Sequence, residues 1–374
     1  MDEKIITIAI HNYARAEILR TRLEAEGIEC YLKNINLIHS SISGGVKVRV
    51  NSKDLEKALR IVEKVSETFR DEYQEEMEST GQSLQRILVP IDFSDYSVNA
   101  CRYAIGLAEK LTAEIKLMHV YYNPVINSMP LTDTYYYQVN MDEIIREIEI
   151  RAKNNMDEFY KDLKEKLERE NIQGVKIDYA LISGIASEEI IAECENYNPD
   201  LVIIGMKGLG ERENDLIGSV TAKIIEDTKV PVLVIPEDSL YQGIATINIL
   251  YATNFDDSDY KALKKLMNIM SPFDFRLNCV HIGTPESNIW DKVKMDSLKE
   301  KLVSQYKDYE IECFIIEDED FLNAIQKIVR DKSIDIISMV THKRNLISKL
   351  LNPSIARKVL FHTNIPFLVF HSDQ

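Results

Sequence analysis

Four residues with small or absent side chains are spaced in a way that could bind a phosphate group. They form the pattern Gly-x2-Gly-x9-Gly-Ser, at Gly205, Gly208, Gly218 and Ser219. Glycine lacks a Cβ, so the backbone can turn sharply and approach a ligand closely. The first amides of a helix point out of its positive end and attract anions. Because one such interaction contributes only about 0.3–1 kcal/mol, several amides and the Ser219 hydroxyl must converge on one phosphate.

This motif must be positioned by a strand before it and a helix after it. Residues 201–204 form an apolar run typical of a strand buried on both faces of a parallel sheet, and residues 220–225 carry an apolar helical stripe. Similar apolar runs occupy 87–91, 115–120 and 230–235, and a long helical stripe covers 141–167. We expect the polar segment 122–140 to be a loop. The pattern predicts a doubly wound α/β sheet with the motif at its carboxyl edge, where such sheets bind ligands.

The pattern recurs in the second half of the chain. Val89–Phe93 corresponds to Tyr251–Phe255 at an offset of 162 residues, and Asp200 corresponds to Asp335 at an offset of 135. Two constant offsets indicate an internal duplication. The change of offset predicts a deletion that removes most of the loop and long helix between the second and third strands of the second repeat.

The second repeat does not preserve the glycine motif. Gly205 becomes Val340, Gly208 becomes Lys343 and Gly218 becomes Pro353, while only Ser219 keeps its type, in Ser354. Asp92 becomes Asn254. A Cβ at Val340 and a missing amide at Pro353 disfavour a phosphate, so we expect no nucleotide there.

The glycine motif resembles the ATP-binding signature of the universal stress protein family, which Gly205, Gly208, Gly218 and Ser219 match without a gap. Val89–Ser94 is similar to the family's first strand and Val230–Val234 to its last. The resemblance implies two tandem Rossmann-like domains of the adenine-nucleotide alpha-hydrolase-like type, the second degenerate. It also implies that the final strands, Val230–Ile235 and Ile365–Phe370, pair within the chain as a pseudo-dimer.

The same resemblance implies the ligand and its contacts. The cofactor would be ATP, with Mg²⁺ as an optional companion. Asp92 would lie near the ribose, the phosphates or the Mg²⁺, and Val120 would offer its backbone to the adenine. The nucleotide-binding residues implied in this way are Pro90, Asp92, Val120, Gly205, Gly208, Gly218, Ser219 and Val220.

Residues 1–67 form a separate α+β pattern, in the order βαββα, with a last helix expected after a Ser52 cap. They resemble a small signal-transducing domain of ferredoxin-like type, through residues 12–17 and 23–28. The charged segment 68–84 is interpreted as a linker. The predicted domains are therefore 1–67, 85–238 and 243–374.

The composition limits the partners. With 45 basic and 61 acidic residues the net charge is −16, which repels nucleic acid and anionic membrane surfaces. Five scattered cysteines without a CxxC pair argue against a disulfide framework or a thiolate metal site, and the acidic start of the chain is unlike a signal peptide. We expect a cytoplasmic protein that binds an adenine nucleotide and an unidentified protein partner.

Three functions remain open. The first is an ATP-binding regulator of a stress response with no catalytic role. The second is a slow ATPase or phosphotransfer enzyme, which requires a base near the γ-phosphate; Asp92 is the candidate, with Glu211, Glu213 and Asp215 as remote options. The third is a nucleotide-free interaction scaffold.

Overall fold

The computed structural model describes residues 5–11, 13–34, 46–55, 57–62, 85–122, 135–209, 217–239, 246–255, 257–283, 288–317, 321–341 and 365–371. The predicted linker 68–84 lies outside these residues, as do Glu211, Glu213, Asp215, Lys343, Pro353 and Ser354.

The N-terminal unit has the predicted βαββα order. Its three strands are β1 (Ile5–His11), β2 (Cys30–Asn34) and β3 (Val46–Asn51), in the antiparallel order β1-β3-β2, with α1 (Tyr13–Ala25) packed on them. Residues 57–62 are helical. The cap is not Ser52 as predicted. Asn51 caps a 3-10 turn, Ser52–Asp54, by accepting the Lys53 amide, since an amide oxygen reaches an amide two residues ahead as readily as a hydroxyl does.

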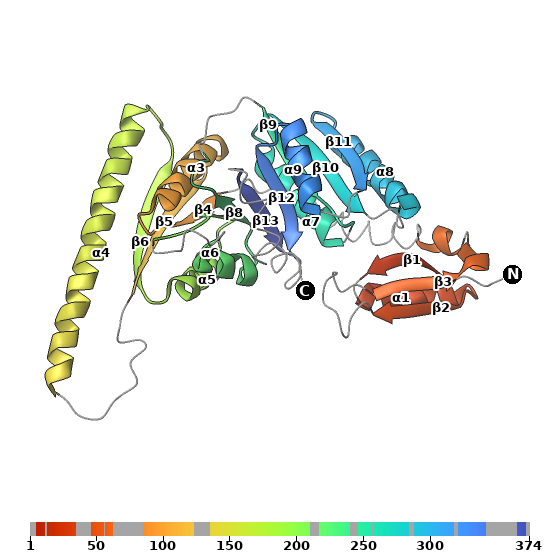
Figure 1. The fold of residues 1–374 in the computed structure, drawn as a ribbon, viewed down its shortest axis with the longest axis horizontal. Helices are drawn as coiled ribbons and strands as arrows, with labels where there is room; N and C mark the ends of the chain where they lie inside the picture. Colours follow the sequence, from red (N-terminus) through yellow and green to blue (C-terminus); the bar gives the residue numbers. More distant parts are fainter. Residues whose placement is uncertain are drawn as a thin grey trace.

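A ten-stranded sheet forms the rest of the fold (Figure 1). The first repeat supplies β4 (Arg86–Pro90), β5 (Glu114–Tyr121), β6 (Lys176–Ser183), β7 (Leu201–Gly205) and β8 (Val232–Ile235). The second supplies β9 (Ile247–Ala252), β10 (Phe275–Gly283), β11 (Glu310–Glu317), β12 (Ile336–Thr341) and β13 (Phe367–His371). The order is β11-β10-β9-β12-β13-β8-β7-β4-β5-β6, so each repeat has its third, second, first, fourth and fifth strands side by side. The strand order of each repeat reverses between its first and fourth strands, which defines the switch point where such sheets bind ligands.

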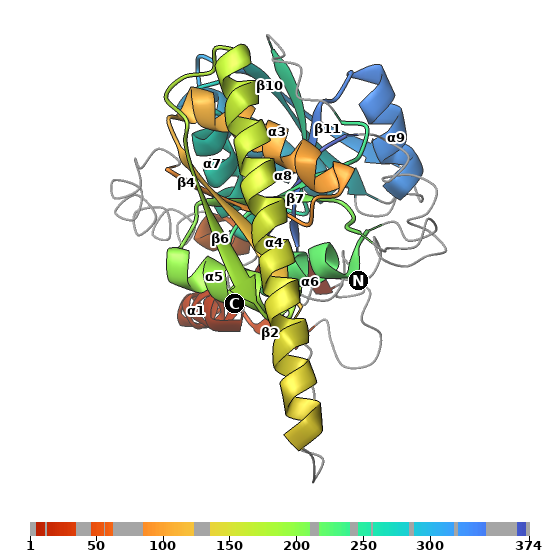
Figure 2. The ribbon, with the colours of Figure 1, turned by 90° about the vertical axis from the view of Figure 1, so that its left-hand side faces the viewer.

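Helices cover both faces of the sheet (Figures 1 and 2). One face carries α3 (Asp95–Leu111), α4 (Tyr135–Arg169), α7 (Asp257–Met270) and α8 (Asn288–Gln305), and one continuous apolar core runs beneath them through both repeats. The other face carries α5 (Ala186–Tyr197), α6 (Ser219–Asp227) and α9 (Phe321–Asp331), over two separate cores. The strands read as continuous apolar runs because both of their faces are buried.

The last strands of the two repeats pair with each other, as the sequence predicts. All pairs within each repeat are parallel, whereas β8 and β13 are antiparallel, with Leu233 opposite Leu368. Both strands begin later than predicted, at Val232 and Phe367, directly after Pro231 and Pro366. Proline cannot donate to a strand ladder, so regular pairing starts behind it.

One predicted length is wrong. Residues 135–140, expected in a loop, belong to α4, which has 35 residues. The segment between the second and third strands is shortened, as the change of offset predicts, from residues 122–175 in the first repeat to residues 284–309 in the second, and α8 has 18 residues. A helix must remain there because a parallel crossover returns the chain over one face of the sheet, and that face needs an apolar cover. Among the described residues, no helix combines the length and apolar character needed to cross a membrane.

The junction between repeats makes a stability prediction. Leu368 is buried at 2% exposure against the shared core, so Leu368→Ala should destabilise the chain by about 2–5 kcal/mol through the cavity it leaves. Urea unfolding followed by circular dichroism measures this change. Val293→Ala is the control, because Val293 is 57% exposed and surface changes usually stay within about 0.5 kcal/mol. Equal effects of the two substitutions would contradict the observed burial of the junction.

Candidate functional site

The site is built around the carboxyl end of β4. Pro90 is its last residue, and Asp92 follows in a turn that Phe93 forms with a φ of 64°. The Asp92 carboxylate accepts two bonds from Ser94 through Oδ1, from the amide at 3.1 Å and from the hydroxyl at 2.5 Å. Its Oδ2 accepts the amide of Leu209 at 2.6 Å. Asp92 therefore joins the end of β4 to the glycine loop that follows β7.

The two loop glycines have different neighbours. A Cβ on Gly205 would lie 2.8 Å from the backbone carbon of Tyr96, at the start of α3. A Cβ on Gly208 would collide with the Asp92 carboxylate. Gly205 therefore lets a helix pack against the strand end, and Gly208 lets the loop approach Asp92. The sequence predicted close backbone approach at both positions, and at Gly205 the structure this backbone approaches is α3.

The start of α6 completes this corner. Gly218 is its N-cap and provides no side-chain cap, and its amide donates to the Met206 carbonyl at 2.8 Å. Ser219 is the first helical residue and is exposed, whereas Val220 is half-buried against the core under α6. Thr221, which the sequence reading missed, donates its buried hydroxyl to the Gly205 carbonyl at 2.8 Å. The spacing of residues in the sequence does not predict this hydrogen bond of Thr221, because it forms only when α6 packs against β7.

Val120 lies on the neighbouring strand. It is half-buried near the end of β5, which pairs with β4. A cavity of about 280 Å³ opens beside it, between β5 and α4, lined by His119, Val120, Tyr121, Tyr122, Ile148, Arg151, Ala152 and Asn155. The Nδ1 of His119 lies 2.7 Å from the Ile91 carbonyl oxygen, and its ring lies 4.5 Å from that of Phe93. The structure thus brings the predicted residues of β4, β5, β7 and α6 to one edge of the sheet.

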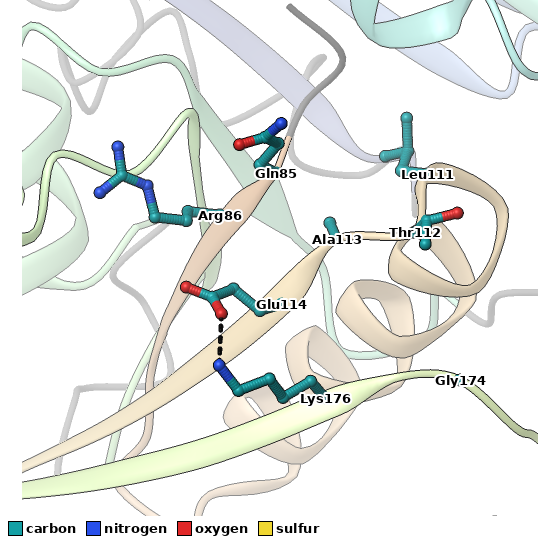
Figure 3. Close-up of a pocket in the computed structure, with 8 residues that line it drawn as sticks. All are labelled: Gln85, Arg86, Leu111, Thr112, Ala113, Glu114, Gly174 and Lys176. Atoms are coloured by element: carbon teal, nitrogen blue, oxygen red, sulfur yellow. Dashed lines mark hydrogen bonds and ion pairs between the residues drawn. The ribbon is translucent and has the colours of Figure 1, made fainter.

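A larger cavity, of about 490 Å³, lies at the opposite edge of the first repeat (Figure 3). It is lined by Gln85, Arg86, Leu111, Thr112, Ala113, Glu114, Gly174 and Lys176, at the amino ends of the strands. Its charges are satisfied within the protein. Lys176 bonds Glu114 at 2.8 Å and, with a hydrogen bond from Tyr197, lowers the pKa of that carboxyl group. Position and charge pairing make this cavity a poorer candidate than the carboxyl edge.

The turn after β9, at the same corner of the second repeat, is held by a different carboxylate. Asp259 is buried, and its carboxylate accepts the Thr253 hydroxyl at 2.9 Å, the Asn254 amide at 2.8 Å and the Tyr251 hydroxyl at 3.2 Å. Val340, in the place of Gly205, is packed into the shared core at 2% exposure. Asn254 is exposed and does not repeat the carboxylate of Asp92.

Other details of the first repeat recur unchanged. The Nδ1 of His281 lies 2.8 Å from the Thr253 carbonyl oxygen, and its ring lies 4.5 Å from that of Phe255, which has a φ of 61°. These values match those of the His119 and Phe93 pair. The two corners therefore share this arrangement of His and Phe, whereas Asp92 and Gly205 are replaced by Asn254 and Val340. In the described parts of the chain, no three His, Cys, Asp or Glu side chains gather as a metal site.

Two parallel half-sheets that each have the strand order 3-2-1-4-5 and carry helices on both faces define a doubly wound, Rossmann-like α/β fold. The Universal stress protein family model matches residues 83–236 and again 247–371, so the chain belongs to this family. A second model, described as "Putative prokaryotic signal transducing protein", matches residues 5–66.

Individual proteins agree with the family assignment. Universal stress protein MJ0531 of Methanocaldococcus jannaschii is 30% identical over 156 residues, which cover 41% of this chain and 84% of that protein. Universal stress protein Slr1230 of Synechocystis sp. is 24% identical over 298 residues, covering 77% of this chain and all of that protein. The crystal structure of a universal stress protein from Archaeoglobus fulgidus has a TM-score of 0.55 at 20% identity, covering 78% of this chain and 98% of that one.

The surroundings of Gly205 and Gly208 predict that substitution by alanine lowers the free energy of unfolding by different amounts. Gly205→Ala should destabilise the chain by about 1–3 kcal/mol, because its Cβ meets the backbone of Tyr96, which cannot move independently of α3. Gly208→Ala should cost less, because its Cβ meets a side-chain carboxylate that can rotate away. Urea unfolding of both variants tests this order. A larger loss for Gly208→Ala would show that the contact between Gly205 and Tyr96 is not as close as described.

Proposed function

We propose that this universal stress protein binds ATP at the first repeat only and acts as a regulatory module of a stress response. The observation that carries the proposal is the convergence of Asp92, Gly208 and the start of α6 at the switch point between β4 and β7. The contacts would come from the set predicted above: Pro90, Asp92, Val120, Gly205, Gly208, Gly218, Ser219 and Val220.

The phosphates would lie at the start of α6. A glycine N-cap offers no side-chain oxygen to the first-turn amides. These amides could therefore donate hydrogen bonds to a phosphate of the ligand. The net charge of −16 does not prevent this, because the helix end acts within the first turn. Backbone amides would make most of the contacts with the phosphates, and the half-buried Val220 would contribute its amide rather than its side chain.

Asp92 would contact the ribose or a metal ion rather than a bare phosphate. Its carboxylate already accepts protein donors through both oxygens, and an anion beside a phosphate would be repelled. A ribose hydroxyl can donate to it, and a Mg²⁺ ion that arrives with the triphosphate can bind it. The adenine would reach the cavity beside Val120, where α4 closes one side.

ATP would regulate the chain by shifting populations between loop conformations. The Leu209 amide is held by Asp92 in the structure, so a ligand that engages Asp92 or Gly208 changes how the loop 205–219 is held. Such a ligand shifts a conformational equilibrium only by its difference in affinity for the two states. The states would differ at the pseudo-dimer junction or in the docking of residues 1–67 to a protein partner. We also propose that the chain has domains at 1–67, 85–238 and 243–374 and that it is located in the cytoplasm.

The enzyme alternative has less support. Both oxygens of Asp92 are engaged in holding the turn and the loop, which suits a positioning role better than proton abstraction. We therefore propose at most weak ATP hydrolysis.

Ser219 gives a test that separates binding from folding. Ser219→Asp places a carboxylate at the exposed first position of α6, where the helix dipole favours it by about 0.3–1 kcal/mol, so stability should hold or rise. The same charge should repel the phosphates and raise the Kd for ATP at least tenfold. Ser219→Asn, neutral and of similar size, is the matched control. Calorimetric titration with ATP, ADP and AMP measures the affinities.

The thermal shift of the unmodified chain tests binding directly. ATP at 100 times its Kd should stabilise the fold by about 2.7 kcal/mol. The absence of both heat and shift would support the nucleotide-free scaffold, and unchanged affinity in Ser219→Asp would place the phosphates elsewhere.

The two repeats provide a second matched pair. Asp92→Ala should raise the Kd for ATP about tenfold, which corresponds to about 1.4 kcal/mol, because a ribose or metal contact is lost. Asn254→Ala, at the equivalent exposed position of the second repeat, should leave the Kd unchanged within twofold. An equal loss in both variants would mean that the nucleotide does not distinguish the repeats.

A further inference from the structure

Two cysteines lie directly opposite each other in the second repeat. Cys279 on β10 and Cys313 on β11 are register partners in adjacent parallel strands. Register partners point to the same face of a sheet, and their Cα atoms are separated by about 4.8 Å. A disulfide needs a Cα separation of roughly 4.4–6.8 Å, so the backbone already places the two residues within bonding range.

The surroundings of the two thiols differ. Cys279 is fully buried, with 0% exposure, in the shared core. Cys313 is half-buried and belongs to β11, the last strand in the order of the ten-stranded sheet. The helix α8 packs over this edge, with Met295 and Leu298 in the same core. Cys313 is therefore the more exposed residue of the pair, and Cys279 is shielded from solvent.

The electrostatics also separate this pair from the other thiols. The Cys279 thiol donates a hydrogen bond to the Cys313 sulfur, and this bond, with the Lys299 ammonium, lowers the pKa of Cys313. The same hydrogen bond, with burial, raises the pKa of Cys279. Burial raises the pKa of Cys30 and Cys194 to about 11 and of Cys101 to about 12. Because the thiolate is the reactive form, the lowered pKa favours reaction at Cys313 over the other four thiols.

We propose that Cys279 and Cys313 form an oxidisable dithiol site whose co-reactant is hydrogen peroxide. The Cys313 thiolate attacks one peroxide oxygen, the O–O bond breaks, and the departing hydroxide takes a proton and leaves as water. Cys313 is then a sulfenic acid. The Cys279 sulfur gives up its proton and attacks the Cys313 sulfur, the S–O bond breaks, and a second water leaves. The two thiols lose two electrons to form one disulfide, and one peroxide becomes two waters.

The disulfide would fix an edge strand. β11 pairs through β10 alone in the described sheet, so a covalent bond between them prevents this edge from separating. A thiol reductant would reverse the change. The site lies in the repeat that lacks the glycine motif, so its chemistry requires no nucleotide at the first repeat.

Peroxide titration of the full chain tests the proposal. Reduced protein is treated with one to five equivalents of hydrogen peroxide, and remaining thiols are alkylated before mass spectrometry. We expect a reversible loss of two hydrogens and a peptide that links Cys279 to Cys313, formed at least tenfold faster than oxidation of Cys101 or Cys194. Equal oxidation of all five thiols, or oxidation without the linked peptide, would overturn the proposal.

Single substitutions assign the two roles. In Cys279→Ser, Cys313 should stop at the sulfenic acid, which dimedone traps; in Cys313→Ser, peroxide should cause neither trapping nor a disulfide. Cys194→Ser, a buried thiol with no cysteine partner, is the control and should form the disulfide at the unmodified rate. Trapping at Cys279 in Cys313→Ser would reverse the assignment and contradict the proposed order. If Cys279→Ser does not fold, the rate of iodoacetamide alkylation in the unmodified chain decides, with Cys313 expected to react first.

Discussion

The antiparallel pairing of β8 with β13 is the constraint on which the rest of the structure depends. It joins two parallel half-sheets into one and buries the edges that each repeat would otherwise expose. It also reverses the direction of the second half relative to the first. The carboxyl ends of the strands in the two repeats therefore point in opposite directions, and the turn after β4 cannot share residues with the turn after β9.

This separation explains how one repeat could lose the glycine motif while the fold survived. In the first repeat the corner is held by Asp92, which reaches across to the Leu209 amide. In the second, the turn after β9 is held internally by the buried Asp259. Each carboxylate satisfies the backbone of its own turn, so the framework of His and Phe is preserved in both. What differs is whether the carboxylate faces a glycine loop.

Much of the fold could be read from the sequence because buried parallel strands are apolar on both faces. The runs at 87–91, 115–120 and 201–204 all contain strands, and the offset of 162 residues that relates Asp92 to Asn254 also relates His119 to His281, which occupy equivalent positions in the structure. The universal stress protein family followed from one motif and its flanking strands. The strands and the glycine motif are each formed by residues close together in the chain, so the order of residue types is enough to predict them.

The remaining features depend on contacts between distant segments. The approach of Gly205 to Tyr96 and the Thr221 bond to the Gly205 carbonyl arise only when α3 and α6 pack on β7. The start of α4 was missed because residues 135–140 are mostly polar or aromatic and show no apolar stripe of helical period. The pairing of Cys279 with Cys313 required the register of two strands 34 positions apart in the chain. The nucleotide contacts themselves remain predictions.

The length of α4 has a consequence for its own stability. At 35 residues it is roughly 50 Å long, whereas the eight-residue β6 spans roughly 26 Å. The helix therefore continues past the sheet, as Figure 2 shows, and Ile144 and Ile150 are 46% and 59% exposed. The C-terminal half of α4 is anchored by the buried Ala152, Met156 and Leu163, whereas the exposed Ile144 and Ile150 contribute little packing to their part of the helix. The amides around Ile144 should therefore exchange with solvent deuterium before those around Met156, so the helix would unwind toward its anchored half.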